Sequence, residues 1–96
     1  MVSVEEVQTM MKRVYYARDA ERGAKATYEW LKEEVEELGG AMRKGDRDGL
    51  EGEFADVLAW LASLANVVQV DLERAVLKKY DNCCPKCSSS PCKCPF

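Results

Sequence analysis

The uneven distribution of proline and cysteine is the feature that most limits how this chain can fold. Residues 1–80 contain neither, whereas three prolines and five cysteines lie together in residues 83–95. Proline inside a helix removes a backbone hydrogen bond and clashes with the preceding turn, so its absence permits long helices. We therefore predict a helical domain at residues 1–80 and a short cysteine-rich tail at residues 81–96.

Apolar residues recur at helical spacing throughout the first part. The pattern predicts a first helix at residues 4–18, a turn at residues 19–23, two further helices, and a short fourth helix at about residues 72–79. The residues expected to begin or end these helices are Ser3, Gly45, Asp48 and Asp71. No convincing strand is found, so the predicted fold is all-α, a small bundle of about four helices.

Two pairs of acidic residues stand beside the apolar stripes of the second and third predicted helices. The pairs are Glu34 with Glu37 and Glu53 with Asp56. At ~100° per residue, the first member of each pair lies roughly 70° from the centre of its stripe and the second roughly 130° away. If the helices pack antiparallel through a short turn, the four carboxylates converge. Such a set suits Mg²⁺, which prefers oxygen ligands and often binds substrate phosphates as well.

A solvated acidic surface is the alternative explanation for these residues. Glutamate is a good helix former, and acidic runs on helices usually face water. From composition and periodicity alone, this alternative is the more common one. The residues that flank the acids are therefore needed to decide between the two explanations.

The flanking residues resemble the MazG-like nucleotide pyrophosphohydrolases of the all-α NTP pyrophosphatase superfamily. That family carries an E-x-x-E pair on one helix and an E-x-x-D pair on the next, as here. Residues 30–38 and 53–61 follow the family pattern in register, and the resemblance covers about residues 10–80. It implies Mg²⁺-dependent hydrolysis of (deoxy)nucleoside triphosphates to monophosphate and pyrophosphate, with house-cleaning of the nucleotide pool as the expected role.

The resemblance also implies roles for individual residues. The acids expected to hold Mg²⁺ and to act in catalysis are Glu34, Glu37, Glu53 and Asp56. The expected substrate contacts are Lys32, Trp30, Trp60 and Asn66, and further candidate phosphate ligands are Lys44, Arg13, Arg18 and Arg22. Core or interface packing is the alternative for the tryptophans, and simple solvent exposure is the alternative for the cations. Active sites of the family lie in bundles of several subunits, so a homodimer or homotetramer is expected.

The tail predicts a metal site of another kind. Its cysteines are spaced as C-x₂-C, four residues, then C-x-C. The cysteines of this pattern are Cys84, Cys87, Cys92 and Cys94. Four thiolates suit one tetrahedral Zn²⁺, and we expect a structural zinc ion here. Disulfides and free thiols are the alternatives, and Cys83 is left outside the pattern.

Charge and composition disfavour several other classes of protein. The net charge is −3, whereas a nucleic-acid binder would show a basic face. No apolar run reaches the ~18 residues that a membrane span requires. The first residues include acids where a signal peptide has cations, so we expect a cytoplasmic protein with a nucleoside triphosphate substrate and neither nucleic acid nor membrane as partner. A non-enzymatic helical zinc-binding adaptor is the alternative function.

Overall fold

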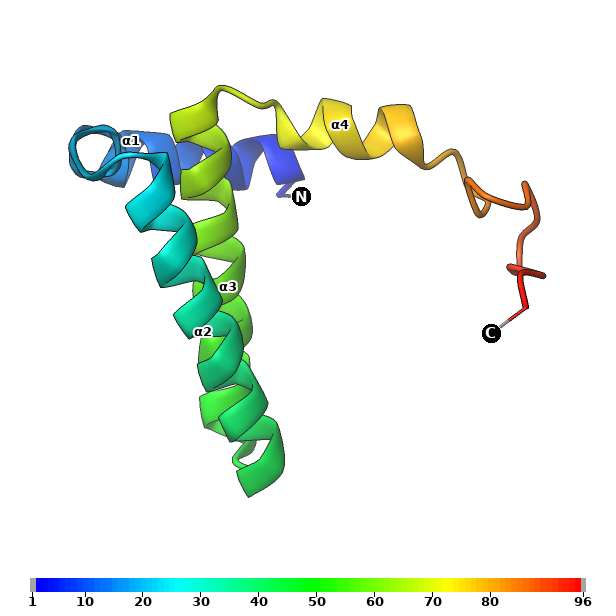
Figure 1. The fold of residues 1–96 in the computed structure, drawn as a ribbon, viewed down its shortest axis with the longest axis horizontal. Coiled ribbons are helices and arrows are strands. Elements are labelled where there is room, and N and C mark those ends of the chain that lie inside the picture. Colours follow the sequence, from blue (N-terminus) through cyan, green and yellow to red (C-terminus); the bar gives the residue numbers. More distant parts are fainter. Residues whose placement is uncertain (1, 96) are drawn as a thin grey trace.

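The computed structural model describes residues 2–95 and is helical over most of that range (Figure 1). Its helices are α1 at Val4–Arg22, α2 at Ala24–Lys44, α3 at Arg47–Val68 and α4 at Leu72–Lys79. The described residues contain no strand, which confirms the predicted all-α class. The fourth helix has the predicted bounds.

Side-chain caps begin three of the helices. Ser3 and Asp71 accept hydrogen bonds from backbone N–H groups of the first turns of α1 and α4, at 3.1 and 3.0 Å, as predicted. The predicted cap of α3 was wrong, because Asp46 Oδ1 accepts the bond from the Gly49 N–H at 3.1 Å. Asp48 lies inside the first turn instead, where its negative charge interacts favourably with the helix dipole.

The first helix is longer than predicted. Residues 19–22, expected in a turn, continue α1, and the break falls on Gly23 alone. Gly23 has a φ of 89°, which favours glycine. The Gly23 N–H donates to the Asp19 carbonyl at 2.9 Å, and the buried Thr27 hydroxyl donates to the Gly23 carbonyl at 2.8 Å. Because both sides of the corner are hydrogen-bonded, α2 can begin directly after α1.

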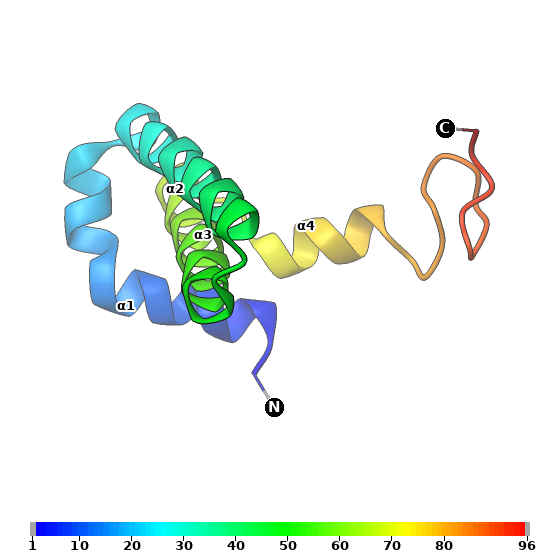
Figure 2. The same cartoon turned by 90° about the horizontal axis from the view of Figure 1, so that it is seen from below.

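α2 and α3 lie side by side as an antiparallel pair and share the most extensive helix contact (Figure 1). Only Gly45 and Asp46 connect them, and Gly45 adopts the left-handed conformation with a φ of 68°. α1 packs across α3 at the other end of the pair (Figure 2). This arrangement sets the two predicted acid pairs on neighbouring helices.

The core is small and lies where α1 crosses α3. The buried residues are Asp19, Thr27, Ala62, Ser63, Ala65 and Asn66. The apolar stripe predicted for α3 is covered only in part, since Phe54 is 58% and Leu58 45% exposed. The reason is that α1 packs on another side of α3, between Asp56 and Asn66, and no described element covers the side that carries Phe54 and Leu58.

The single chain exposes more surface than a typical folded monomer. Its accessible area is 7576 Å², whereas a monomer of this mass exposes about 5,500 Å². Its radius of gyration is 15.6 Å, compared with about 12.5 Å for a domain of this length. Both differences follow from the uncovered face of the helix pair and from the projection of α4 and the tail (Figures 1 and 2).

α4 turns away from α3 by 97° and packs against α1. The Leu72 N–H donates to Gln8 Oε1 at 2.9 Å, which fixes this corner. Among the described residues, no single helix is long and apolar enough to span a membrane. Only α3 and α4 together meet the length and composition required, and they are bent at their junction.

Candidate functional site

Three of the four predicted acids come together on the α2–α3 pair. One carboxylate oxygen each from Glu34, Glu37 and Glu53 lies within 4.8 Å of the other two, and we call these residues the acid cluster. Asp56 lies one turn beyond Glu53 and outside this set, although its charge still raises the pKa of Glu34 and of Glu53. The short turn at Gly45 therefore brings three of the four predicted carboxylates together, and Asp56 stays outside the set.

Two carboxylates of the acid cluster are partly withdrawn from water. Oε2 of Glu34 and Oε2 of Glu53 are buried and have no hydrogen-bond partner among the described residues. Burial, followed by the neighbouring carboxylates, raises the pKa of Glu34 to about 7. The same causes raise the pKa of Glu53. Both groups therefore ionise less readily than a solvated glutamate, and a positive charge beside them would favour the ionised form.

The helical angles explain which acids are buried. Glu34 and Glu53, the members nearer the apolar stripe, are half-buried, whereas Glu37 and Asp56 are exposed. Residues three apart lie on neighbouring positions of one helix flank, so each pair presents one inner and one outer carboxylate. The acid cluster thus lies at the edge of the helix interface, open to solvent on one side.

A cavity of about 200 Å³ adjoins Asp56 where α1 meets α3. It is lined by Tyr15, Arg18, Asp19, Arg22, Asp56, Ala59, Trp60 and Ser63. Arg22 pairs with Asp19 at 2.7 Å, and its guanidinium lies 4.9 Å from the centre of the Trp60 ring. The cavity therefore combines cationic groups and an aromatic surface with one of the predicted acids.

The two tryptophans stack on each other across the α2–α3 interface. The ring centres of Trp30 and Trp60 are 5.7 Å apart, and the ring planes differ by 14°. The contact agrees with packing, the alternative to base stacking that the sequence left open for both tryptophans. Trp30 is 47% exposed, and stacking of either ring on a base stays a prediction.

Two other predicted substrate contacts are engaged elsewhere. Lys32 pairs with Glu29 at 3.0 Å, and its Nζ lies 5.2 Å from the centre of the Tyr28 ring. Asn66 lies ten residues beyond Asp56, about 15 Å along α3. Their roles in substrate binding stay predictions.

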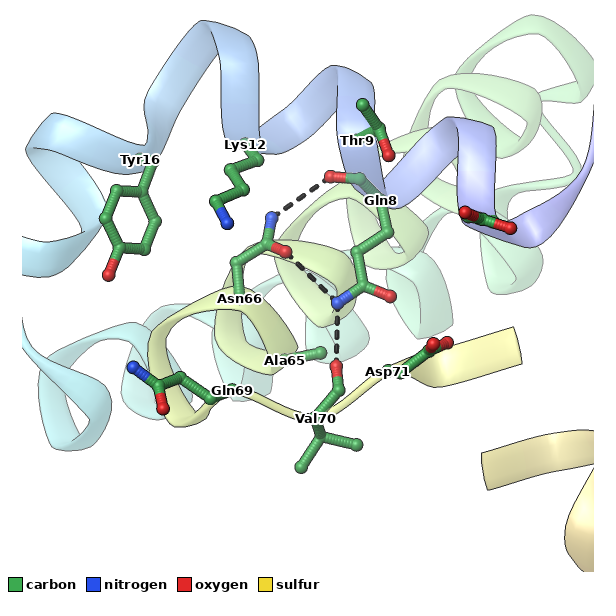
Figure 3. A pocket seen from close by; sticks show the side chains of 10 residues that line it. Gln8, Thr9, Lys12, Tyr16, Ala65, Asn66, Gln69, Val70 and Asp71 are labelled. Carbon is green, nitrogen blue, oxygen red and sulfur yellow. Dashed lines mark hydrogen bonds between the residues drawn. The ribbon is translucent and has the colours of Figure 1, made fainter. Parts of the chain in front are cut away.

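Asn66 joins α3 to α1 through two hydrogen bonds (Figure 3). Its Oδ1 accepts from Gln8 Nε2, and its Nδ2 donates to the Gln8 carbonyl, each at 3.1 Å. Gln8 Nε2 also donates to the Val70 carbonyl at 2.7 Å. A cavity of about 390 Å³ opens beside this network, and Lys12 and Tyr16 lie along it (Figure 3). It lies toward the opposite end of α3 from Glu53, so it is distinct from the acid cluster.

The sequence analysis missed three buried or bridging polar residues. Asp19 is 2% exposed, and its Oδ2 has no partner among the described residues. Thr27 is fully buried, and Gln8 bonds both α3 and α4. For Asp19, the only sequence signal was its i, i+3 spacing to Arg22. The polar bonds of Gln8 cross more than fifty residues and leave no local pattern.

The cysteines of the tail form a second, separate cluster. The sulfur atoms of four cysteines all lie within 4.8 Å of one another, and we call these residues the cysteine cluster. They are Cys84, Cys87, Cys92 and Cys94. Backbone N–H groups of Lys93 and Ser89 lower the pKa of the Cys87 thiol to about 6. The tail thus favours thiolate at this position.

Comparison with known proteins identifies the family. The chain matches the MazG nucleotide pyrophosphohydrolase domain over residues 22–88, a span that contains the acid cluster and Asp56. No curated protein matches the chain significantly. The match supports nucleotide pyrophosphohydrolase activity and a nucleotide substrate in general terms. The predicted boundary between the helical domain and the tail at residue 80 stays a prediction. Because the match spans well over half of the 96 residues, the chain belongs to the MazG nucleotide pyrophosphohydrolase domain family.

Proposed function

We propose that this protein hydrolyses (deoxy)nucleoside triphosphates to monophosphate and pyrophosphate, depends on Mg²⁺, and removes unwanted nucleotides from the pool. The observation that carries the proposal is the acid cluster, with two buried and unpartnered carboxylate oxygens, in a chain of this family. A purely solvated acidic face would keep its carboxylate oxygens in water. The buried Glu34 and Glu53 oxygens therefore favour a bound cation over the surface alternative.

The residues present fit Mg²⁺ as the cation. All available donors are carboxylate oxygens, which this hard ion prefers over nitrogen or sulfur. Glu34, Glu37 and Glu53 would hold the ion, with Asp56 as the fourth predicted ligand. When bound, the ion would polarise phosphate oxygens and stabilise the charge that develops on them.

The reaction requires an acceptor for one proton. A water oxygen bonds to the α-phosphorus, the bond from that phosphorus to the bridging oxygen breaks, and pyrophosphate leaves with the bridging oxygen. The proton released by the water passes to a carboxylate. The acid cluster supplies such groups where water has access, since Glu37 is exposed beside the half-buried Glu34 and Glu53. The absence of histidine from the chain does not prevent this chemistry.

The cavity beside Asp56 supplies groups for the rest of the nucleotide. The guanidinium groups of Arg18 and Arg22 suit phosphate oxygens. The Trp60 ring lies between Trp30 and the Arg22 guanidinium, so a base would stack on it only when Arg22 moves aside. Asn66 acts at a distance in this scheme, because its bonds to Gln8 hold α1, which carries both arginines. We therefore assign Asn66 to positioning and not to substrate contact.

We further propose that a second copy of the chain covers the uncovered face of the helix pair, in a homodimer or homotetramer. The chain exposes roughly 2,000 Å² more than a typical monomer of its mass, and a standard interface buries about 800 Å² on each partner. Phe54, Leu58 and Leu61 on α3 are each at least 40% exposed and lie on this face. Their burial against a second copy would supply the core that one chain lacks.

The test is a product assay with a panel of standard and modified (d)NTPs, in Mg²⁺ and in EDTA. We expect metal-dependent release of monophosphate and pyrophosphate from at least one nucleotide, and preference for modified nucleotides would support the clearing role. Diphosphate and orthophosphate as products would refute the cleavage position. No hydrolysis, together with no Mg²⁺-linked rise in melting temperature, would favour the adaptor alternative.

Matched variants connect the activity to the acid cluster. Glu37→Gln and Glu53→Gln each remove one proposed ligand and are expected to abolish turnover while helicity is kept. Glu36→Gln is the control, because Glu36 is exposed on the same helix and lies outside the cluster. Full activity in both cluster variants would refute the site assignment.

A further inference from the structure

The four sulfur atoms of the cysteine cluster are spaced as in a tetrahedral metal site. The Cys84 and Cys94 sulfurs are 3.7 Å apart, and the Cys87 and Cys92 sulfurs are 3.9 Å apart. Zn–S bonds of about 2.3 Å at tetrahedral angles place neighbouring sulfurs about 3.8 Å apart. A disulfide requires about 2.05 Å between its sulfurs, so either pairing would need the tail to rearrange.

The backbone of the tail is arranged around these sulfurs. The Lys93 N–H donates to the Cys87 sulfur at 3.4 Å, and the Cys94 N–H donates to the Cys92 sulfur at 3.3 Å. Such N–H donors stabilise thiolate charge, and they are the usual surroundings of metal-bound cysteine. Backbone bonds between Cys84 and residues 88 and 89, at 2.7 and 2.9 Å, close the loop between the two halves of the cluster.

The tail lacks another means of holding this shape. Within the described part of the chain, residues 81–95 are exposed or half-buried, and the hydrogen bonds found for them stay within the tail. A segment of this length without an apolar core needs a crosslink or a metal to stay folded. The converging thiols are the only group of this kind that the described tail contains.

We propose that Cys84, Cys87, Cys92 and Cys94 bind one Zn²⁺ ion and that this ion folds the tail as a small unit separate from the acid cluster. Thiolate ligands bind zinc and not magnesium, whereas magnesium requires oxygen ligands such as carboxylates. The two proposed sites therefore differ in ligand type, and Mg²⁺ would not compete for the cysteine cluster. Because α4 and the tail project away from the α2–α3 pair (Figure 1), zinc in the tail is expected to leave the acid cluster unchanged.

The test measures zinc in the full-length protein, purified reduced and without a histidine tag. The chain has no histidine, so retained zinc belongs to cysteine or carboxylate. After dialysis against a weak chelator, metal analysis is expected to find one zinc per chain. Replacement by Co²⁺ is expected to give the intense sulfur-to-cobalt absorption of a tetrahedral thiolate site.

Cysteine variants locate the site. Cys87→Ser and the double variant Cys84→Ser/Cys87→Ser are expected to lose the retained zinc and the cobalt absorption. Cys83→Ser is the matched control, because Cys83 is adjacent in sequence and lies outside the cluster. It is expected to keep one zinc per chain. Circular dichroism of each variant is expected to show the helical domain intact, so loss of zinc cannot be ascribed to unfolding.

Three outcomes would overturn the proposal. The first is wild-type protein that holds no zinc after reduction and zinc addition. The second is intact-mass evidence that the four cysteines form disulfides in protein isolated without reductant and do not exchange them for metal. The third is zinc that the double variant retains as the wild type does, which would place the ion on the carboxylates. None of these depends on whether the protein hydrolyses nucleotides.

Discussion

The substitution Glu34→Gln tests whether the acid cluster carries an electrostatic cost in the metal-free protein. Burial, and then the neighbouring carboxylates, raises the pKa of Glu34 from 4.5 to about 7. The folded state therefore binds this proton more tightly than the unfolded state. The stability that it contributes is fully present below pH 4.5 and is lost as the pH rises through 7. Glutamine has nearly the same shape and stays neutral at every pH, so it removes this loss.

The size of the effect follows from the change in pKa. A shift from 4.5 to about 7 corresponds to roughly 3 kcal/mol. The Glu34 side chain keeps some contact with solvent, which screens the neighbouring charges, so we expect about 1–2 kcal/mol. In a domain of this length, that difference moves the melting temperature by roughly 4–16 °C.

The assay is urea unfolding of both proteins in EDTA at pH 4 and pH 8, at one fixed protein concentration. At pH 8 the glutamine variant is expected to be the more stable, and at pH 4 the two are expected to be nearly equal. Glu36→Gln is the control, since it removes one charge from an exposed position of the same helix. If Glu34→Gln is no more stable than Glu36→Gln at pH 8, the reasoning about the buried carboxylate is wrong.

Three further predictions concern the surroundings of the acid cluster. Asn66→Ala removes both side-chain bonds to α1 and is expected to cost about 1–3 kcal/mol in urea unfolding; a loss below 0.5 kcal/mol would contradict its bridging role. The double variant Phe54→Asp/Leu58→Asp is expected to sediment as a monomer where the wild type sediments as a dimer or tetramer, and an unchanged assembly would place the interface elsewhere. Arg18→Ala is expected to raise KM roughly tenfold with little change in kcat (~1.4 kcal/mol), whereas Arg74→Ala, exposed on α4 and outside the cavity, is expected to act as wild type.

Local chemistry made much of the fold predictable. α4 has the predicted bounds because Asp71 caps it within a single turn. Where two local signals competed, the sequence did not decide between them, and Asp46 proved to be the cap in place of Asp48. The end of α1 was placed too early because Asp19 looks like a turn residue in isolation. In the structure Asp19 is buried and pairs with Arg22 within the same helix, so burial and this local ion pair accompany the extension of the helix to Gly23.

Spacing predicted which side chains share a face, but it could not show how much of that face one chain covers. The stripe through Phe54 and Leu58 has correct helical periodicity, yet α1 packs on another side of α3 and leaves both side chains exposed. The same limit applies to Gln8 and Asn66, whose bonds depend on how α1 crosses α3. The approach of Glu34 to Glu53 was predictable because a two-residue turn leaves few ways to pair α2 with α3.

The two proposed metal sites differ in what a bound cation would do for the structure. In the acid cluster, repulsion between the carboxylates costs free energy. The helices bring these carboxylates together whether or not a cation is present, because the helix pair is fixed by its own packing. A cation there removes repulsion in a site that already exists. In the cysteine cluster the described tail has little packing of its own, so a cation would supply the fold itself. Loss of metal should therefore leave the acid cluster assembled, but should unfold the tail.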